Sequence, residues 1–260
     1  MTTPEMFSLD GTVVIVTGGT RRYGSAFCDG LAEAHGTVCL TSRSQERADQ
    51  RAEEIRQRGY EAHGYALELA DDESIEQLVQ AVMADHGRID VLVNNARTLP
   101  PAAFGAITRE ELHGSFDVNI IGWALLTRRV VEEMRAAGGG NIITISSIYG
   151  MGGQYPTIYK DPERALSMDY PLQKGGVIAW TKQLATILAD DNIRANCLSL
   201  GGLREESHDE HFLEGYRLRT PMGRMAGGED VKGPIVFLAS DASRYMTGAN
   251  LVVDGGWTAW

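Results

Sequence analysis

The sequence predicts a single-domain α/β protein with a doubly wound parallel sheet and helices on both of its faces. Three observations carry this prediction. Short β-branched runs alternate with longer segments of helical periodicity along most of the chain. The strand runs are almost wholly apolar, as parallel strands are when right-handed crossover helices cover both sides of a sheet. The 260 residues, 43% of them apolar, fit one domain with a large aliphatic core.

Two strand–helix units and a third strand are predicted first. The buried run TVVIVT predicts a strand over 12–17, and the amphipathic segment 25–35 predicts the helix that follows. A second apolar run predicts a strand over 37–42, and the charged segment after it predicts a helix over 45–58. The short run at 65–69 predicts the third strand.

The second half continues the same alternation. Apolar residues at helical spacing predict a helix over 74–86, and the run IDVLVN predicts a strand over 89–94. A long helix over about 109–137 leads to the strand NIITIS at 141–146. The remaining predicted elements are a helix over 172–189, a strand over 193–199, a helix near 230–238 and a strand over 250–253.

Two segments fit the alternation poorly, 150–169 and 203–228. Long ordered loops are usually functional, so we expect both to be substrate loops at the carboxyl edge of the sheet. The second contains His208-Asp209-Glu210-His211. We interpret it as a mobile acidic lid rather than a metal site, because the chemistry inferred below needs no metal.

The charge and the cysteines limit the classes of partner. A formal charge of −11 argues against nucleic acid or an anionic membrane as the main partner. Cys28, Cys39 and Cys197 lie in apolar runs without paired spacing, which indicates buried thiols in a reducing compartment. The first ten residues have no apolar core of a signal peptide, and no apolar run approaches the ~20 residues of a membrane span. We therefore expect a cytoplasmic protein.

A glycine-rich turn follows the first strand. In TGGTRRYG at 17–24, a strand precedes the glycines and a helix follows them, which is the context of a dinucleotide-binding turn. At the end of the second strand, where an acid would select NAD, the chain has Ser42-Arg43, and Arg21 lies on the same side. Guanidinium groups suit a 2′-phosphate, so NADP(H) is the predicted cofactor and NAD(H) the alternative.

Tyr170 and Lys174 are four residues apart and so share one face of a helix. A phenol is a weak base at neutral pH, and a nearby ammonium favours its ionised form. Tyr170 could then act as the acid in ketone reduction and as the base in alcohol oxidation. Ser147, after the fifth strand, could hydrogen-bond the substrate oxygen.

These motifs together resemble the short-chain dehydrogenase/reductase family. The likeness spans Leu9 to Trp257 in the family's order. It rests on TGGTRRYG at 17–24, NNA at 94–96, DVN at 117–119, ISS at 145–147, YPLQKGG at 170–176 and VDGG at 253–256.

The resemblance implies a seven-stranded single-domain Rossmann fold and a homotetramer or dimer. It also implies a catalytic tetrad of Asn119, Ser147, Tyr170 and Lys174, in which Lys174 holds the nicotinamide ribose and Asn119 anchors a water relay. The cofactor-binding residues expected from the turn and the family pattern are Gly18, Thr20, Arg21, Arg22, Tyr23, Gly24, Ser42, Arg43, Glu68, Leu69, Asn95, Ala96, Tyr170, Lys174 and Gly201.

The chain departs from the family at several of these positions. Arg22 and Tyr23 replace a glycine and an aliphatic residue, so we expect the pyrophosphate cradle to bulge or to bind with side-chain help. Arg97 replaces the glycine after NNA, which puts a cation where the substrate or nicotinamide would lie. Glu68 stands for an aspartate, and Gly201 follows a leucine where proline is usual.

The stretch between Ser147 and Tyr170 is longer than usual in the family. Its SIYG opening and the GGW near the end of the chain are similar to members that act on sugars in bacterial glycoconjugate pathways. The expected substrate residues are Arg97, Ser147, Tyr149, Tyr159 and Arg204.

Four cations lie in the predicted substrate loops or just after a strand: Arg97, Lys160, Arg164 and Arg204. They would suit a carboxylate or phosphate. The alternative is surface ion pairing with Glu163, Glu205 or Glu206.

The predicted function is an NADP(H)-dependent oxidoreductase that interconverts a ketone and a secondary alcohol on a small polar substrate, anionic or sugar-like. Two alternatives stay open. One is a nucleotide-binding regulatory or scaffold protein on the same fold, because a fold does not fix a function. The other is an isomerase or dehydratase that retains its nucleotide. Neither the direction nor the stereochemistry of the reaction follows from the residues.

Overall fold

The computed structural model describes residues 1–98, 105–162 and 167–260. Its seven strands form one parallel sheet in the order β3-β2-β1-β4-β5-β6-β7. The strands are β1 (Val13–Val16), β2 (Thr37–Ser42), β3 (Ala62–Ala66), β4 (Val91–Asn94), β5 (Gly140–Ser147), β6 (Ile193–Leu200) and β7 (Asn250–Val253). The strand order reverses between β1 and β4, which creates a crevice at the carboxyl ends of these strands. The predicted doubly wound fold is confirmed.

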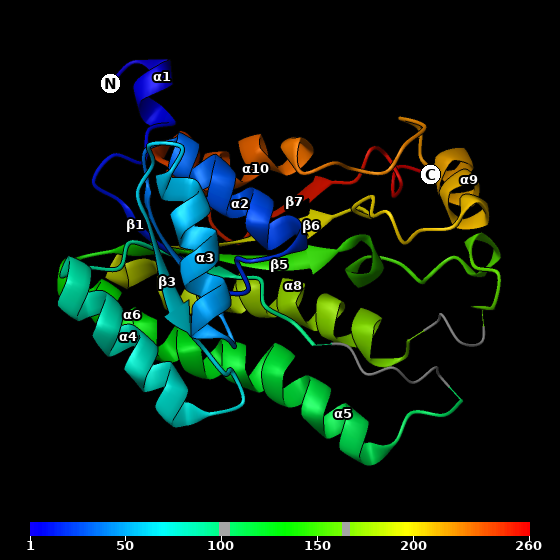
Figure 1. Cartoon of the computed structure of the whole chain (residues 1–260), viewed down its shortest axis with the longest axis horizontal. Coiled ribbons are helices and arrows are strands. Elements are labelled where there is room, and N and C mark those ends of the chain that lie inside the picture. Colours follow the sequence, from blue (N-terminus) through cyan, green and yellow to red (C-terminus); the bar gives the residue numbers. More distant parts are fainter. Residues whose placement is uncertain (99–104, 163–166) are drawn as a thin grey trace.

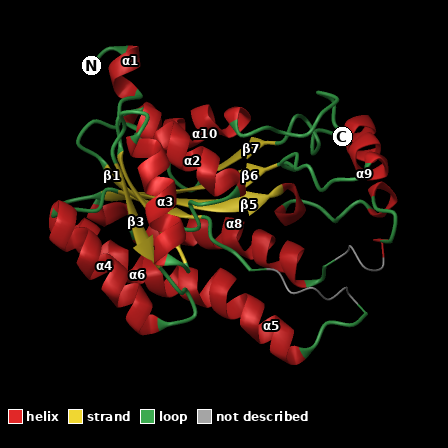
Figure 2. Ribbon diagram, in the orientation of Figure 1, coloured by secondary structure: helices red, strands yellow, loops and turns green. Residues whose placement is uncertain are grey.

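Helices cover both faces of the sheet (Figures 1 and 2). One layer contains α2 (Arg22–Glu33), α3 (Gln45–Arg56) and α10 (Glu229–Ala239), and the other contains α4 (Asp72–His86), α6 (Trp123–Ala137) and α8 (Asp169–Ile187). The other helical segments are α1 (Thr3–Met6), α5 (Arg109–Phe116), α9 (Glu210–Arg219), a π-helix η1 (Asp117–Gly122) and the 3₁₀ turns η2 (Ile148–Gly150), η3 (Pro156–Ile158), η4 (Ala189–Asp191) and η5 (Asp241–Ser243).

Each layer buries its own apolar core against the sheet. Phe27 and Leu31 of α2 and Leu238 of α10 pack on one face, and Trp123 and Leu126 of α6 pack on the other, all at most 1% exposed. Because apolar burial is the main favourable term in folding, these two cores fix the sheet between its helices. Along the described chain, no helix combines the length and the apolar character that a bilayer crossing requires.

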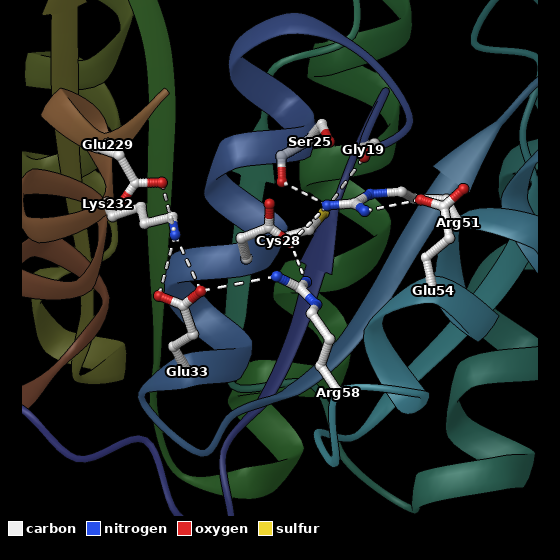
Figure 3. Close-up of polar contacts among 10 residues, drawn as sticks. Gly19, Ser25, Cys28, Glu33, Arg51, Glu54, Arg58, Glu229 and Lys232 are labelled. Atoms are coloured by element: carbon white, nitrogen blue, oxygen red, sulfur yellow. Dashed lines mark hydrogen bonds and ion pairs between the residues drawn. The ribbon is translucent and has the colours of Figure 1, made fainter. Parts of the chain in front are cut away.

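Ion pairs connect the helices of the first layer at their solvent side. Lys232 of α10 contacts Glu33 of α2 at 2.9 Å, and Arg58, just after α3, approaches the same carboxylate at 3.8 Å (Figure 3). Arg51 of α3 pairs with Asp29 of α2 at 2.5 Å. Partly exposed pairs contribute about 0–1 kcal/mol each, so they adjust the packing of α2, α3 and α10 rather than drive it.

Two sequence predictions need correction. The third strand lies at Ala62–Ala66 rather than at 65–69, because Gly64 lets it pack against α3: an added Cβ there would lie 2.4 Å from the backbone of Ala48. The segment 203–228 is not simply a loop, because its centre forms α9. A small apolar cluster that includes Ile158, Tyr216 and Trp257 holds α9 against the rest of the domain.

Candidate active site

A cavity of about 1100 Å³ opens at the carboxyl edge of the sheet. The residues that line it come from the ends of β1, β2, β4, β5 and β6, from the start of α8 and from α9. Nearly all the predicted site residues lie here: Gly18, Thr20, Arg21, Arg22, Tyr23, Gly24, Ser42, Arg43, Glu68, Leu69, Asn95, Ala96, Arg97, Ser147, Tyr149, Tyr159, Tyr170, Lys174 and Gly201. Asn119 is buried behind the wall, and Arg204 is exposed outside the cavity.

The glycine-rich turn forms one end of the cavity. A Cβ at Gly24 would lie 2.2 Å from the carbonyl oxygen of Gly18, so no larger residue fits there. Asn95 fastens the turn to β4, because its Nδ2 donates to the carbonyls of Thr17 at 2.8 Å and Gly18 at 3.2 Å. The first turn of α2 follows at once, so backbone N–H groups and the positive end of the helix dipole face the cavity.

Arg22 is accommodated in this turn by a left-handed backbone, with φ of 54°. That is the conformation which glycine, the usual residue in the family, adopts without strain. Its guanidinium reaches across the cavity mouth to Glu205, with 2.7 Å between Nη2 and Oε2. Tyr23 donates a hydrogen bond to the carbonyl of Gly201 at 2.9 Å, and burial raises the pKa of Tyr23. Both departures from the family thus connect the turn to the segment after β6.

Three arginines surround the end of β2. Arg21 and Arg43 line the cavity as the sequence predicts, and so does Arg47, which the sequence analysis missed. The signal for Arg47 was available, since it lies four residues after Arg43 in the first turn of α3. A carboxylate that would accept hydrogen bonds from the ribose of NAD is missing from this end of β2.

The start of α8 carries the central pair. Lys174 is buried, donates from Nζ to the carbonyl of Ile145 at 2.7 Å, and lies 5.8 Å from the centre of the Tyr170 ring. Burial and, to a smaller extent, the nearby charge of Arg97 lower the pKa of Lys174 to about 7. The sequence suggested a fully protonated Lys174, but with a pKa of about 7 its amine is only partly protonated at neutral pH. Ser147 ends β5, and its Oγ accepts from the backbone of Tyr149 at 3.2 Å.

Asn119 is held inside a buried polar network. It lies in η1, a π-helical turn of the kind that often occurs at functional sites. Its Nδ2 donates to the carbonyl of Thr98 at 2.7 Å and to Oε1 of Gln173 at 2.8 Å, and its Oδ1 accepts from the backbone of Thr98. Gln173 in turn donates to Ser115, which donates to the fully buried Asp169.

The sequence analysis missed this network beyond Asn119. Asp169 and Gln173 repeat the four-residue spacing of Tyr170 and Lys174, one position earlier on the same helix. That spacing was the available signal for a second pair of polar side chains on one face of α8.

The predicted substrate loops meet at the far end of the cavity, although residues 163–166, Arg164 among them, lie outside the described chain. The hydroxyls of Tyr149 and Tyr159 are 3.1 Å apart, and burial raises the pKa of both phenols. His208, Phe212 and Tyr216, three lining residues that the sequence did not predict, follow a helical four-residue spacing along and just before α9. Lys160, by contrast, is exposed and pairs with Asp209 at 3.3 Å.

A group that could ligate a metal ion lies elsewhere. Ligand atoms of Glu61, His63 and His86 are all within 4.8 Å of one another, at the edge of the sheet formed by β3 and the end of α4. None of the three lines the cavity, so they take no part in the chemistry considered below.

Comparisons with known proteins agree on one family. The model of the family described as Enoyl-(Acyl carrier protein) reductase matches residues 23–258. The 3-oxoacyl-[acyl-carrier-protein] reductase FabG of Aquifex aeolicus is 32% identical over 252 residues, which cover 95% of this chain and 98% of that protein. Dehydrogenase/reductase SDR family member 4 of Homo sapiens is 33% identical over 260 residues, which cover 95% of this chain and 88% of that protein.

A solved structure matches the whole chain. It is a gluconate 5-dehydrogenase from Burkholderia cenocepacia, crystallised with NADP and tartrate. The two chains are 30% identical, superpose with a TM-score of 0.91 and cover each other over 100% of their lengths.

Proposed function

The chain belongs to the short-chain dehydrogenase/reductase family of oxidoreductases, and from this premise we propose that it uses NADP(H) to interconvert a ketone and a secondary alcohol on a small polar substrate. The observation that carries the proposal is that Ser147, Tyr170 and Lys174 line the same cavity as the glycine-rich turn. A hydride donor held at the turn and a proton donor on α8 would thus serve one bound substrate.

The residues around the turn fit a dinucleotide. The absence of a side chain at Gly24 lets the start of α2 lie against the carbonyl of Gly18, and a pyrophosphate would bind at the N-terminus of this helix. Arg21, Arg43 and Arg47 would bind a 2′-phosphate, since guanidinium groups form charge-assisted hydrogen bonds with phosphate. The NADP in the Burkholderia relative supports the same choice. Asn95, Ala96 and Lys174 would line the nicotinamide half.

The chemistry follows from three polar side chains that line the cavity: Ser147, Tyr170 and Lys174. Bound NADPH supplies a hydride to the carbonyl carbon of the substrate. Tyr170 gives its phenolic proton to the carbonyl oxygen, which becomes the hydroxyl of the alcohol, and Ser147 donates a hydrogen bond to that oxygen as its negative charge grows. The protonated form of Lys174 stabilises the phenolate left on Tyr170. In alcohol oxidation the same groups act in reverse.

The lining of the substrate end favours polar molecules. The hydroxyls of Tyr149 and Tyr159 and the amide of Gln154 line the cavity there and can bind substrate hydroxyls. The segments 150–169 and 203–228 would form the two sides of this substrate end. A sugar-derived ketone is therefore the class to test first, which agrees with the gluconate named for the Burkholderia relative.

A cofactor-coupled screen tests the proposal. Keto sugars, keto acids and acyl ketones are offered with NADPH and with NADH, and the absorbance of the reduced nicotinamide is followed. We expect turnover with NADPH and a loss of roughly 10²- to 10⁴-fold in kcat for Tyr170→Phe, because a general acid contributes about that much. NADPH binding, followed by fluorescence, should be unchanged in the variant.

The alternatives predict different results. A scaffold protein would bind NADPH, turn over none of these compounds and be indifferent to Tyr170→Phe. An isomerase or dehydratase would convert substrate without net oxidation of NADPH. Either result would overturn the proposal.

A further inference from the structure

Arg97 lies between the proposed cofactor site and the substrate segments. It follows NNA directly after β4, where the family pattern has glycine, and it lines the cavity. Its Cζ lies over the Tyr170 ring, 5.3 Å from the ring centre, so the guanidinium makes a cation–π contact with the phenol that would donate the proton.

No acid among the described residues forms an ion pair with Arg97. Within the described chain, the guanidinium forms no hydrogen bond or ion pair. The carboxylate whose charge acts on it, that of Glu205, is bound by Arg22 at 2.7 Å. Burial lowers the pKa of Arg97, but an arginine stays charged at any ordinary pH. A largely buried cation without a counter-ion is costly and therefore needs an anion from outside.

The position of this cation selects the kind of anion. The planar fork of N–H donors of Arg97 matches the geometry of a carboxylate, and no hydrogen bond within the described chain uses these donors. Because the cation lies over Tyr170, the carboxylate would be only a few bonds from the carbon that reacts. Glu68 is the one carboxylate among the lining residues of the described chain, and it comes from the strand β3 side near the cofactor end. Glu205, whose charge also acts at Arg97, is paired with Arg22, so an anion at Arg97 would meet little repulsion.

We propose that Arg97 binds the carboxylate of the substrate, and that the enzyme acts on hydroxy acids and keto acids in preference to neutral alcohols and ketones. This rests on the proposed function and adds a substrate class to it. Arg97 is then a specificity-determining residue. The effect of Arg97 on Lys174 supports this role of Arg97. The guanidinium lowers the pKa of Lys174, so an anion bound at Arg97 would favour the protonated lysine that stabilises the phenolate of Tyr170.

Binding measurements with paired ligands test the proposal with a readout other than reaction rate. Tartrate, gluconate and pyruvate are titrated by calorimetry into the full chain saturated with NADP, and tartramide serves as the neutral counterpart of tartrate. The variants are Arg97→Gly, which restores the family residue, and Arg97→Lys, which keeps the charge but not the fork. The matched control is Arg204→Ala, since Arg204 is an exposed cation after β6 that does not line the cavity.

At least one of the three anions should bind the wild type more tightly than tartramide does. We expect Arg97→Gly to weaken the binding of that anion roughly 10- to 100-fold, which is the usual effect of losing a hydrogen bond to a charged group. The affinity for tartramide should change by less than about threefold. Arg97→Lys should give an intermediate loss, and Arg204→Ala none.

The outcomes separate the two proposals. Failure of all three anions to bind the wild type would overturn the carboxylate site, as would equal losses for tartrate and tartramide in Arg97→Gly. If the protein binds an anion through Arg97 but reduces no ketone, the carboxylate site stands and the proposed ketone–alcohol function is refuted.

Discussion

Lys174, which we propose takes part in catalysis, is buried at the expense of stability. The residue is 5% exposed and its pKa in the folded chain is about 7, against 10.5 in water. Below pH 7 the folded and unfolded chains both carry the proton, and the folded state bears the full cost of a buried charge. As pH rises from 7 to 10.5 only the unfolded chain retains the proton, so this cost disappears and the stability contributed by the site increases.

Replacing Lys174 by methionine, which has a similar volume, removes this pH dependence. We expect the variant to gain stability relative to the wild type near pH 6.5 and to lose roughly 2 kcal/mol of that advantage by about pH 9. Urea denaturation at the two pH values measures the difference. A stability difference that does not change with pH would show that Lys174 titrates normally in the folded chain.

Single residues were predicted best where a motif fixed both their identity and their place. Tyr170, Lys174 and Ser147 belong to elements with strong patterns, and all three line the cavity. Arg204 lies outside it, because sequence places a residue in a loop but not its side chain on one side of that loop. Gln173 was missed since a glutamine in a helix is usually solvated; only the fold brings η1 against it.

At the scale of elements, the buried network couples two helical segments that are far apart in sequence. Gln173 of α8 accepts a hydrogen bond from Asn119 of η1 and donates to Ser115 of α5. The side chain is 2% exposed, so water cannot replace these partners. The network therefore holds the π-helical turn in register with the tyrosine and lysine of α8.

We expect Gln173→Met to lower the unfolding free energy by about 1–3 kcal/mol, the cost of leaving buried polar groups without partners. It should also lower kcat with little change in KM, because Asn119 would lose one of its anchors. Gln183→Met on the exposed side of α8 is the matched control and should stay within about 0.5 kcal/mol of the wild type. If both variants unfold alike, the network has no structural role.

Element boundaries were predicted where periodicity was unbroken. The strands β2 and β7 have the predicted bounds, whereas β3 starts three residues earlier than expected. The reason is local: a His-Gly pair inside a strand looks like a turn until the contact of Gly64 with α3 is known. Likewise, apolar spacing predicted one long helix over 109–137, but it cannot reveal that η1 interrupts the α-helical register.

For the whole molecule, the order of strands and helices led to the correct architecture, because crossover rules leave few ways to arrange parallel strands. The assembly is a different matter. The tetramer or dimer implied by the family resemblance depends on surfaces outside the domain core, and it stays a prediction that light scattering of the purified protein would check.

Cofactor binding connects the turn, β4 and α8, and so should stabilise the entire domain. A ligand present at about 100 times its dissociation constant adds about 2.7 kcal/mol to the unfolding free energy, which corresponds to roughly 5–10 °C in Tm for a domain of this size. We expect NADPH to raise Tm more than NADH at equal concentration, because the proposed site would add contacts between the 2′-phosphate and Arg43 and Arg47. Thermal unfolding followed by circular dichroism measures both shifts.

Arginine variants test whether the residues at the end of β2 cause the preference for NADPH over NADH. Arg43→Ala and Arg47→Ala should each reduce the NADPH shift towards the NADH value and leave the NADH shift unchanged, since only NADPH carries the 2′-phosphate. Arg128→Ala, an exposed arginine on α6, should change neither. Equal shifts for the two cofactors in the wild type would mean that Arg21, Arg43 and Arg47 do not bind a phosphate, and that the acid missing from β2 has no effect on cofactor choice.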